Sequence, residues 1–195
     1  MYLFISTETA GPDPKYSLLS ASFILVDKEF NVIPISGLES GLSLQIKPKD
    51  YLVNGNWMRE KGFNLTINDT QALPVQKAKK LACDFIEESL DVVNGHSPSR
   101  NKKLIVAGHG VKSFDEPFVR THLIDDERFW HQCFRGVPFD TAGISLFLQA
   151  AGLIGLEKGG SNLLYLQQSF VPNCEDRRFV QIELAKKFVR MVRTP

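Results

Sequence analysis

The segment Leu18–Val26 (LLSASFILV) constrains the fold most, because a run of nine mainly apolar residues that ends at the turn-like pair Asp27-Lys28 predicts a buried β-strand. A shorter apolar segment, Tyr2–Ile5, precedes it. Leu42–Ile46 alternates apolar and polar residues with a period of two and stops before Lys47-Pro48. These three segments predict an antiparallel meander of strands.

Helical periodicity follows the meander. From Pro74, apolar side chains recur at three- and four-residue spacing as far as Leu90, which predicts a helix. The short run Leu104–Ala107 predicts a fully buried strand, and a helix from Glu116 to Leu123 follows it. We also predict a strand at Val137–Phe139, a helix capped at Asp140-Thr141 that ends near Ala151, a short helix from Ser161 or Asn162 to Gln168, and a last helix from Glu175 to Val192.

This order of elements predicts an α/β fold with a central mixed sheet, in which parallel strands extend the antiparallel meander and helices flank the sheet. The chain has 195 residues, of which 43% are hydrophobic and 23% charged, values that suit one globular domain over residues 1–195. The net charge of +1 excludes binding of nucleic acid by overall charge, so any anion site must be a local basic patch.

The cysteines and the apolar stretches indicate the compartment. Cys83, Cys133 and Cys174 are odd in number and widely spaced, which argues against a disulfide framework or a zinc site and favours a reducing environment. The longest apolar stretch, Gly143–Leu156, is too short and too interrupted to span a bilayer. With no targeting segment visible, we expect a cytoplasmic protein with no membrane partner.

Two polar clusters follow predicted strands. The first strand runs into Ser6-Thr7-Glu8-Thr9 within FISTETAGPDP, where Glu8 is the charged residue of the cluster. The strand Leu104–Ala107 runs into GHGVKSFDEPFV, which contains Asp115. One carboxylate alone is a weak acid–base or metal site, so the function depends on whether the two clusters meet.

These two segments resemble known motifs. FISTETAGPDP is similar to the first motif of the DEDD (DnaQ-like, RNase T-like) 3′–5′ exonucleases, F-x-D-x-E-T-x-G-x-x-P, and GHGVKSFDEPFV is similar to the second, H-N-x-x-F-D-x-x-F-L. Lys47-Pro48, LTINDTQ before Pro74 and PFDTAGISLFL at 138–148 fall where that family has similar segments. The resemblance therefore covers nearly the whole chain and implies the ribonuclease H-like exonuclease fold.

The resemblance implies a reaction in which two divalent ions, held by four carboxylates, hydrolyse phosphodiester bonds. Glu8 matches the first-motif Glu and Asp115 the second-motif Asp, so both are implied to be catalytic and metal-binding. Ser6 stands where the family has its first Asp. When the third motif is aligned on the last helix, Val180 stands in place of the last Asp and Glu175 in place of the His.

The departures from the motifs weaken the implied metal site. Each missing carboxylate removes a charge that contributes several kcal/mol even at an effective dielectric constant of about 20. We therefore expect Mg²⁺ or Mn²⁺, if bound, to be held weakly, as one ion rather than two, by Glu8 and Asp115. Asp176 and Glu183 lie four residues before and three residues after Val180, so they are candidate substitute ligands. The alternative is that both are solvated surface acids.

Other residues are assigned to substrate binding: Thr9, His109, Lys112 and Phe118. Lys112 is a candidate phosphate ligand because it lies beside the second motif. His109 has an alternative interpretation as a loop histidine bonded to backbone, and Phe118 as a core residue. Basic residues also cluster on the last helix, at Arg177, Arg178, Lys186, Lys187, Arg190 and Arg193.

Three hypotheses follow. The first is a degenerate member of the exonuclease family, with lost or weakened catalysis, that binds the 3′ end of a single-stranded nucleic acid, a nucleotide or a protein partner. The second is an active 3′–5′ exonuclease on single-stranded RNA or DNA that uses substitute acids such as Asp176 or Glu183. The third is an unrelated α/β domain that matches by chance, in which Glu8 and Asp115 lie far apart.

Overall fold

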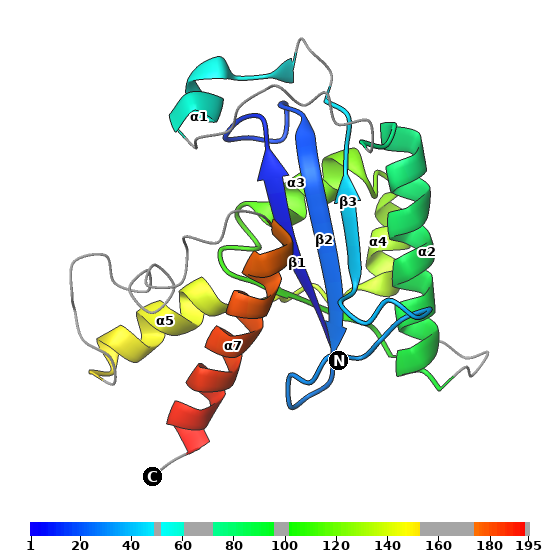
Figure 1. Ribbon diagram of the computed structural model, residues 1–195. Helices are drawn as coiled ribbons and strands as arrows, with labels where there is room; N and C mark the ends of the chain where they lie inside the picture. Colours follow the sequence, from blue (N-terminus) through cyan, green and yellow to red (C-terminus); the bar gives the residue numbers. More distant parts are fainter. Residues whose placement is uncertain (49–51, 61–71, 96–101, 153–173, 194–195) are drawn as a thin grey trace.

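The computed structural model describes residues 1–48, 52–60, 72–95, 102–152 and 174–193, and within the last range the side chains of residues 179–191. A five-stranded sheet with the order β3-β2-β1-β4-β5 forms its centre (Figure 1). The strands are β1 (Tyr2–Thr9), β2 (Leu18–Val26), β3 (Leu42–Gln45), β4 (Ile105–Gly108) and β5 (Phe139–Asp140).

The sheet is mixed, as predicted. β1 pairs antiparallel with β2 from Tyr2 opposite Val26 to Glu8 opposite Ser20, and β2 pairs antiparallel with β3. The meander is therefore confirmed. β4 runs parallel to β1, and β5 runs parallel to β4. The carboxyl ends of β1 and β4 consequently lie at the same edge of the sheet.

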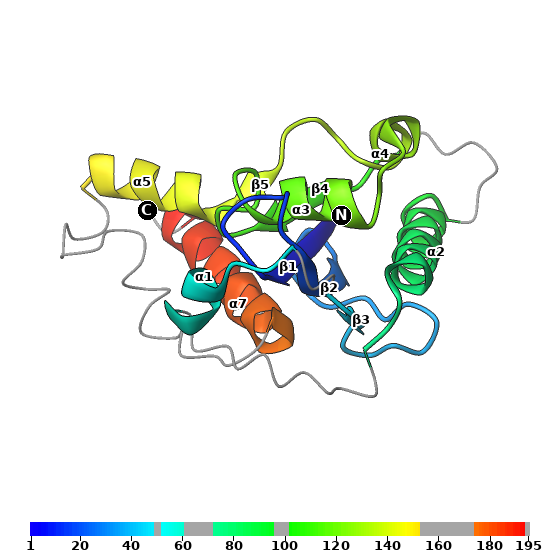
Figure 2. The ribbon, with the colours of Figure 1, turned by 90° about the horizontal axis from the view of Figure 1, so that it is seen from above.

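Helices cover both faces of the sheet (Figure 2). α2, α3 and α4 lie on one face and α7 on the other, and α5 packs against α7. The helices are α1 (Gly55–Glu60), α2 (Val75–Val93), α3 (Asp115–His122), α4 (Glu127–Cys133), α5 (Thr141–Ala150) and α7 (Cys174–Arg193).

The alternation of side chains along β1 separates two cores. Ile5 packs with Phe85 of α2 and Phe118 of α3 in the larger core. Phe4 packs with Ile182 and Ala185 of α7 in the smaller one. Because successive side chains of a strand point to opposite faces, the even-numbered residues at the end of β1 face α7 and the odd-numbered ones face α3.

Several elements differ from the sequence predictions. β5 covers Phe139–Asp140 rather than Val137–Phe139. β1 continues through the polar cluster to Thr9, and α1 and α4 were not predicted. Both missed helices begin at side-chain caps: Asn54 Oδ1 accepts hydrogen bonds from two backbone N–H groups of α1, and Asp126 does the same for α4. The short helix expected from Ser161 or Asn162 to Gln168 lies outside the described residues.

The structure also bears on the cysteines and on the membrane. Cys83 is half-buried and Cys133 is buried, and neither forms a disulfide within the described residues. Over the described ranges, no helix is both long enough and apolar enough to cross a bilayer.

Candidate functional site

The two motifs meet through a pair of hydrogen bonds between Asp115 and Thr7. Asp115 Oδ1 accepts one from the backbone N–H of Thr7 and one from its hydroxyl, both at 2.8 Å. Asp115 is 5% exposed and begins α3, while Thr7 is in β1. The pairing of β1 with β4 ends at Phe4, which lies opposite Ala107. Beyond that point, the Asp115 carboxylate accepts the backbone N–H of Thr7 in β1.

Glu8 follows Thr7 directly, so both motif acids lie at the same end of the sheet. The hypothesis of a chance match, which requires Glu8 and Asp115 to be far apart, is therefore wrong. Ser6 and Glu8 share the face of β1 that α7 covers, whereas Thr7 faces α3. Ser6 is buried and Glu8 is half-buried.

Helix α7 supplies no carboxylate to this face from its described side chains. Val180, at the position assigned to the third-motif Asp, is half-buried and has no ligating atom. Glu183 lies on the exposed side of the helix and pairs with Lys186 at 2.8 Å, so its proposed role as a substitute ligand is not supported by its placement. Glu175 and Asp176 belong to α7, but their side chains lie outside the described ones.

The buried polar residue of α7 is Gln181, which sequence reasoning missed. It is 2% exposed, and within the described part of the chain its Oε1 has no hydrogen-bond partner. It precedes Ala185 by four residues and Phe188 by seven, so it extends the apolar row of this helix. That spacing was the available signal for its burial.

The loop of the second motif is tied to the start of α5 by Asp140. Asp140 Oδ1 accepts hydrogen bonds from the backbone N–H groups of Gly110, at 2.8 Å, and Ala142, at 3.0 Å. Its Oδ2 accepts one from the backbone N–H of Lys112 at 3.3 Å. Asp140 therefore caps α5 as predicted and also holds the loop. Gly110 has φ +68°, a conformation that glycine and asparagine tolerate best, which explains why Gly can replace the usual Asn here.

One ring nitrogen of His109 bonds the side chain of Thr141. Its Nδ1 lies 3.0 Å from Thr141 Oγ1, and the Thr141 hydroxyl donates to the carbonyl of Gly108 at 3.1 Å. Because a hydroxyl carries one hydrogen, Nδ1 must be the donor toward Thr141. His109 thereby fixes the end of β4 to the start of α5; its assignment to substrate binding stays a prediction.

Lys112 begins a chain of ion pairs that runs along α3. Its ammonium lies 2.8 Å from Oε1 of the buried Glu116, which also pairs with Arg120 at 3.3 Å. Arg120 in turn pairs with Glu127 of α4, and its hydrogen bond holds the pKa of Glu127 below the usual value. The Lys112 side chain is 55% exposed and can still contact a solvent anion.

Two other predicted substrate contacts are buried. Thr9 is 2% exposed and its hydroxyl donates to the carbonyl of Gly11 at 2.7 Å. Phe118 is 1% exposed and packs against Phe114 and His122, so burial favours its alternative interpretation as a core residue. Both side chains are thus engaged within the fold, and their assignment to substrate binding stays a prediction.

The exonuclease motifs imply metal ions, so the donor set must be tested against them. Asp115 Oδ1 already accepts two hydrogen bonds, and Ser6 offers a neutral hydroxyl where a carboxylate is needed. Among the described residues, no three His, Cys, Asp or Glu side chains form a group that could hold a metal ion. The described donors alone therefore supply fewer carboxylate oxygens than a centre of two divalent ions needs.

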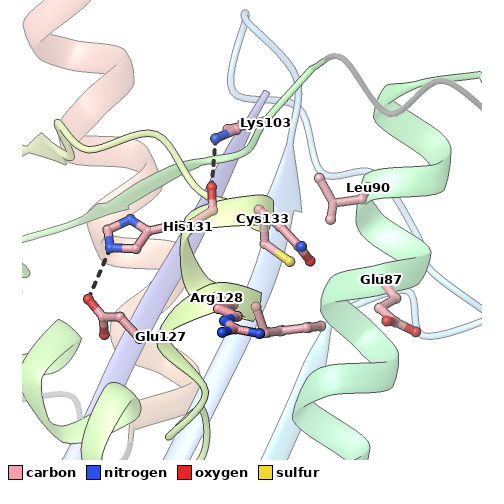
Figure 3. Close-up of a pocket in the computed structure, with 9 residues that line it drawn as sticks. Glu87, Leu90, Lys103, Glu127, Arg128, His131 and Cys133 are labelled. Carbon is pink, nitrogen blue, oxygen red and sulfur yellow. Dashed lines mark hydrogen bonds and ion pairs between the residues drawn. The ribbon is translucent and has the colours of Figure 1, made fainter.

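A large cavity lies away from this site, between α2 and α4 (Figure 3). Its volume is about 580 Å³. Cys133 and Leu90 border it from the two helices, and His131 Nε2 lies 3.0 Å from Glu127. Both acidic and basic side chains line the cavity, and neither Glu8 nor Asp115 is among them. The candidate site is therefore identified by the contacts at the carboxyl ends of β1 and β4 and not by the size of a cavity.

Solved structures of known proteins share this fold. No known family model matches the sequence, and no curated protein sequence matches it. Exonuclease I from Methylocaldum szegediense superposes with a TM-score of 0.71 at 20% identity, covering 100% of this chain and 41% of its own. E. coli exonuclease I in complex with a dT13 oligonucleotide gives 0.68 at 15% identity, covering 95% of this chain and 40% of that one.

The zinc-bound form of an E. coli exonuclease I complex with single-stranded DNA gives a TM-score of 0.70 at 16% identity, covering 98% of this chain and 40% of that one. The chain thus has the ribonuclease H-like fold of these exonucleases, which confirms the fold that the motifs implied. It spans about two fifths of the length of the matched chains.

Proposed function

We propose that this chain binds single-stranded nucleic acid at the carboxyl ends of β1 and β4 without efficient two-metal hydrolysis. The observation that carries the proposal is that one motif position still holds its acid while a neighbouring motif position has lost it. Asp115 is present but is bonded to Thr7, while Ser6 replaces the carboxylate beside Glu8. The fold is shared with exonuclease I structures, while the charge that two dications need is reduced.

Structural neighbours support nucleic acid as the ligand. Exonuclease I chains with the same fold form complexes with dT13 and other single-stranded oligonucleotides. On this chain, the exposed ammonium of Lys112 stands beside the loop that Asp140 holds, where it can contact a phosphate. The ligand is then a 3′ end or a nucleotide, held through its phosphates.

A divalent ion remains compatible with this proposal in a reduced role. Glu8 and Asp115 are the acids that would hold Mg²⁺ or Mn²⁺, and such an ion would lessen the repulsion between these carboxylates and a phosphate. With two acids, we expect one weakly bound ion. The second candidate function is an active 3′–5′ exonuclease with substitute ligands such as Asp176 or Glu183. It depends mainly on Asp176, because Glu183 is exposed and pairs with Lys186.

Binding is tested with a fluorescent single-stranded oligonucleotide in the presence of a chelator, followed by anisotropy at several salt concentrations. We expect Lys112→Ala to weaken binding by about 3- to 10-fold. The slope of the logarithm of the binding constant against the logarithm of the salt concentration should become shallower by roughly one, the value for one lost phosphate contact. Lys80→Ala is the matched control, since Lys80 pairs with Asp84 at the same i,i+4 spacing but lies on α2.

The proposal fails if the wild-type chain does not bind the oligonucleotide at low salt. It also fails if Lys80→Ala weakens binding as much as Lys112→Ala, because the attraction is then a general effect of charge.

A further inference from the structure

Helices α5 and α7 pack against each other along an apolar seam (Figures 1 and 2). Leu148 of α5 packs with Leu184 and Phe188 of α7 in one buried cluster. Ile144, one turn earlier on α5, packs against the same cluster. Gln181 lies three residues before Leu184 and seven before Phe188, so it continues the row of α7 that faces α5. A polar side chain is therefore placed in a seam that is otherwise apolar.

Three buried polar atoms on this helix pair have no hydrogen-bond partner among the described residues: Ser145 Oγ and Gln149 Nε2 on α5, and Gln181 Oε1 on α7. Ser145 is 0% exposed and Gln181 is 2% exposed. A buried polar atom without a partner disfavours the folded state by about 5-fold or more in the folding equilibrium. Because nearly all buried polar atoms in proteins are satisfied, three such atoms on one helix pair point to a partner that they share.

The placement and chemistry of these atoms define that partner. Ser145 directly follows Ile144 and lies one turn before Gln149, so both polar side chains of α5 flank its contact with α7. The Gln149 amide nitrogen only donates, the Gln181 carbonyl oxygen only accepts, and the Ser145 hydroxyl does both. A cation cannot serve the first atom and an anion cannot serve the second. Water serves all three, and a buried water typically makes about three hydrogen bonds.

We propose that the α5–α7 seam binds an ordered water molecule through Ser145 Oγ, Gln149 Nε2 and Gln181 Oε1. The water accepts a hydrogen bond from the Gln149 amide, donates one to the Gln181 carbonyl and shares one with the Ser145 hydroxyl. One turn before Ser145, at the start of α5, Thr141 Oγ1 lies 3.0 Å from His109 Nδ1 in the second-motif loop. The water thus fastens α7 to the helix that holds this loop, a role that does not depend on the proposed nucleic-acid ligand.

The variant Gln181→Met distinguishes a hydrated seam from a dry one by the sign of its effect. Met has a length and helix propensity close to those of Gln but lacks the amide. Removing an oxygen without a partner stabilises a protein, whereas removing one that is bonded to water destabilises it. We expect urea denaturation to give a folding equilibrium constant about 5-fold smaller than that of the wild type. Gln132→Met, at an exposed position of α4, is the control and should stay within about 2-fold.

The variant Ser145→Ala tests whether the polar atoms share one partner. Alone, it should also lower the folding equilibrium constant by about 5-fold. Combined with Gln181→Met, the total loss should be smaller than the roughly 25-fold product of the single losses, because both side chains bind the same water.

The water itself is detected by NMR cross-relaxation in the ¹⁵N-labelled chain. The side-chain amide protons of Gln149 should show a cross-peak with long-lived water, and the double variant Ser145→Ala, Gln181→Met should lose it. A Gln181→Met variant more stable than the wild type overturns the proposal, since the seam is then dry. A wild type without the cross-peak also overturns it, and so does a double variant that keeps it, because other groups then hold the water.

Discussion

Replacing Asp115 by alanine is expected to lower the free energy of unfolding by about 3 kcal/mol. The backbone N–H and the hydroxyl of Thr7 both donate to Asp115 Oδ1, and both residues are buried. Without that oxygen, two buried donors lose their acceptor, and each unsatisfied group costs roughly 1–3 kcal/mol. Urea denaturation of wild type and variant measures the difference.

Asp115→Asn is the matched control for this prediction. Its carbonyl oxygen can still accept both bonds from Thr7, so most of the stability should be kept, with a loss of about 1 kcal/mol. Thr7→Val removes the hydroxyl bond alone and should cost about 1 kcal/mol. An Asp115→Ala variant as stable as the wild type would show that the carboxylate does not hold β1 and α3 together.

Ser6→Asp is expected to make stability depend on metal ions. The introduced carboxylate would share a face of β1 with Glu8, and the two negative charges would repel each other and be poorly solvated without a cation. Each added carboxylate contributes several kcal/mol of attraction to a dication. We expect the variant to be less stable than the wild type in a chelator and to gain about 2.7 kcal/mol when Mn²⁺ exceeds its Kd 100-fold.

Ser6→Asn is the control, because it adds a side chain of similar size without the charge. It should lose stability through crowding at this buried position, with no recovery in Mn²⁺. Thermal unfolding with increasing Mn²⁺ follows all three proteins. If Ser6→Asp and Ser6→Asn respond equally to Mn²⁺, the face of β1 beside Glu8 is not the metal site.

The regular part of the fold could be predicted from local pattern. β2 was predicted over the same residues that the structure shows, because nine consecutive mainly apolar residues between turns have few other structures available. The end of β1 was missed, because Ser6 and Glu8 are polar. Pairing with β2 and the bond from Thr7 to Asp115 extend the strand, and both are long-range contacts. Helix α4 was missed although Asp126 is a typical N-cap.

Of the candidate site, only the residues that match the exonuclease motifs could be predicted from the sequence. Glu8 and Asp115 came from the resemblance, and the structure places them at one end of the sheet. The hydrogen bonds of Asp140 to the second-motif loop depend on residues about thirty positions apart, which periodicity cannot relate. The burial of Thr9 and Phe118 likewise follows from packing, which the motifs do not describe. Gln181 was missed because the motif alignment selected its neighbour Val180.

The measurement that tests the central claim most directly is a Mn²⁺ titration with a single-stranded oligonucleotide labelled at its 3′ end, in which binding and release of the label are followed in one sample. The account predicts that the strand is bound and that the label stays attached throughout the titration. Mn²⁺-dependent release of the label that disappears in Asp115→Asn would contradict it, because the site would then hold enough metal charge for hydrolysis.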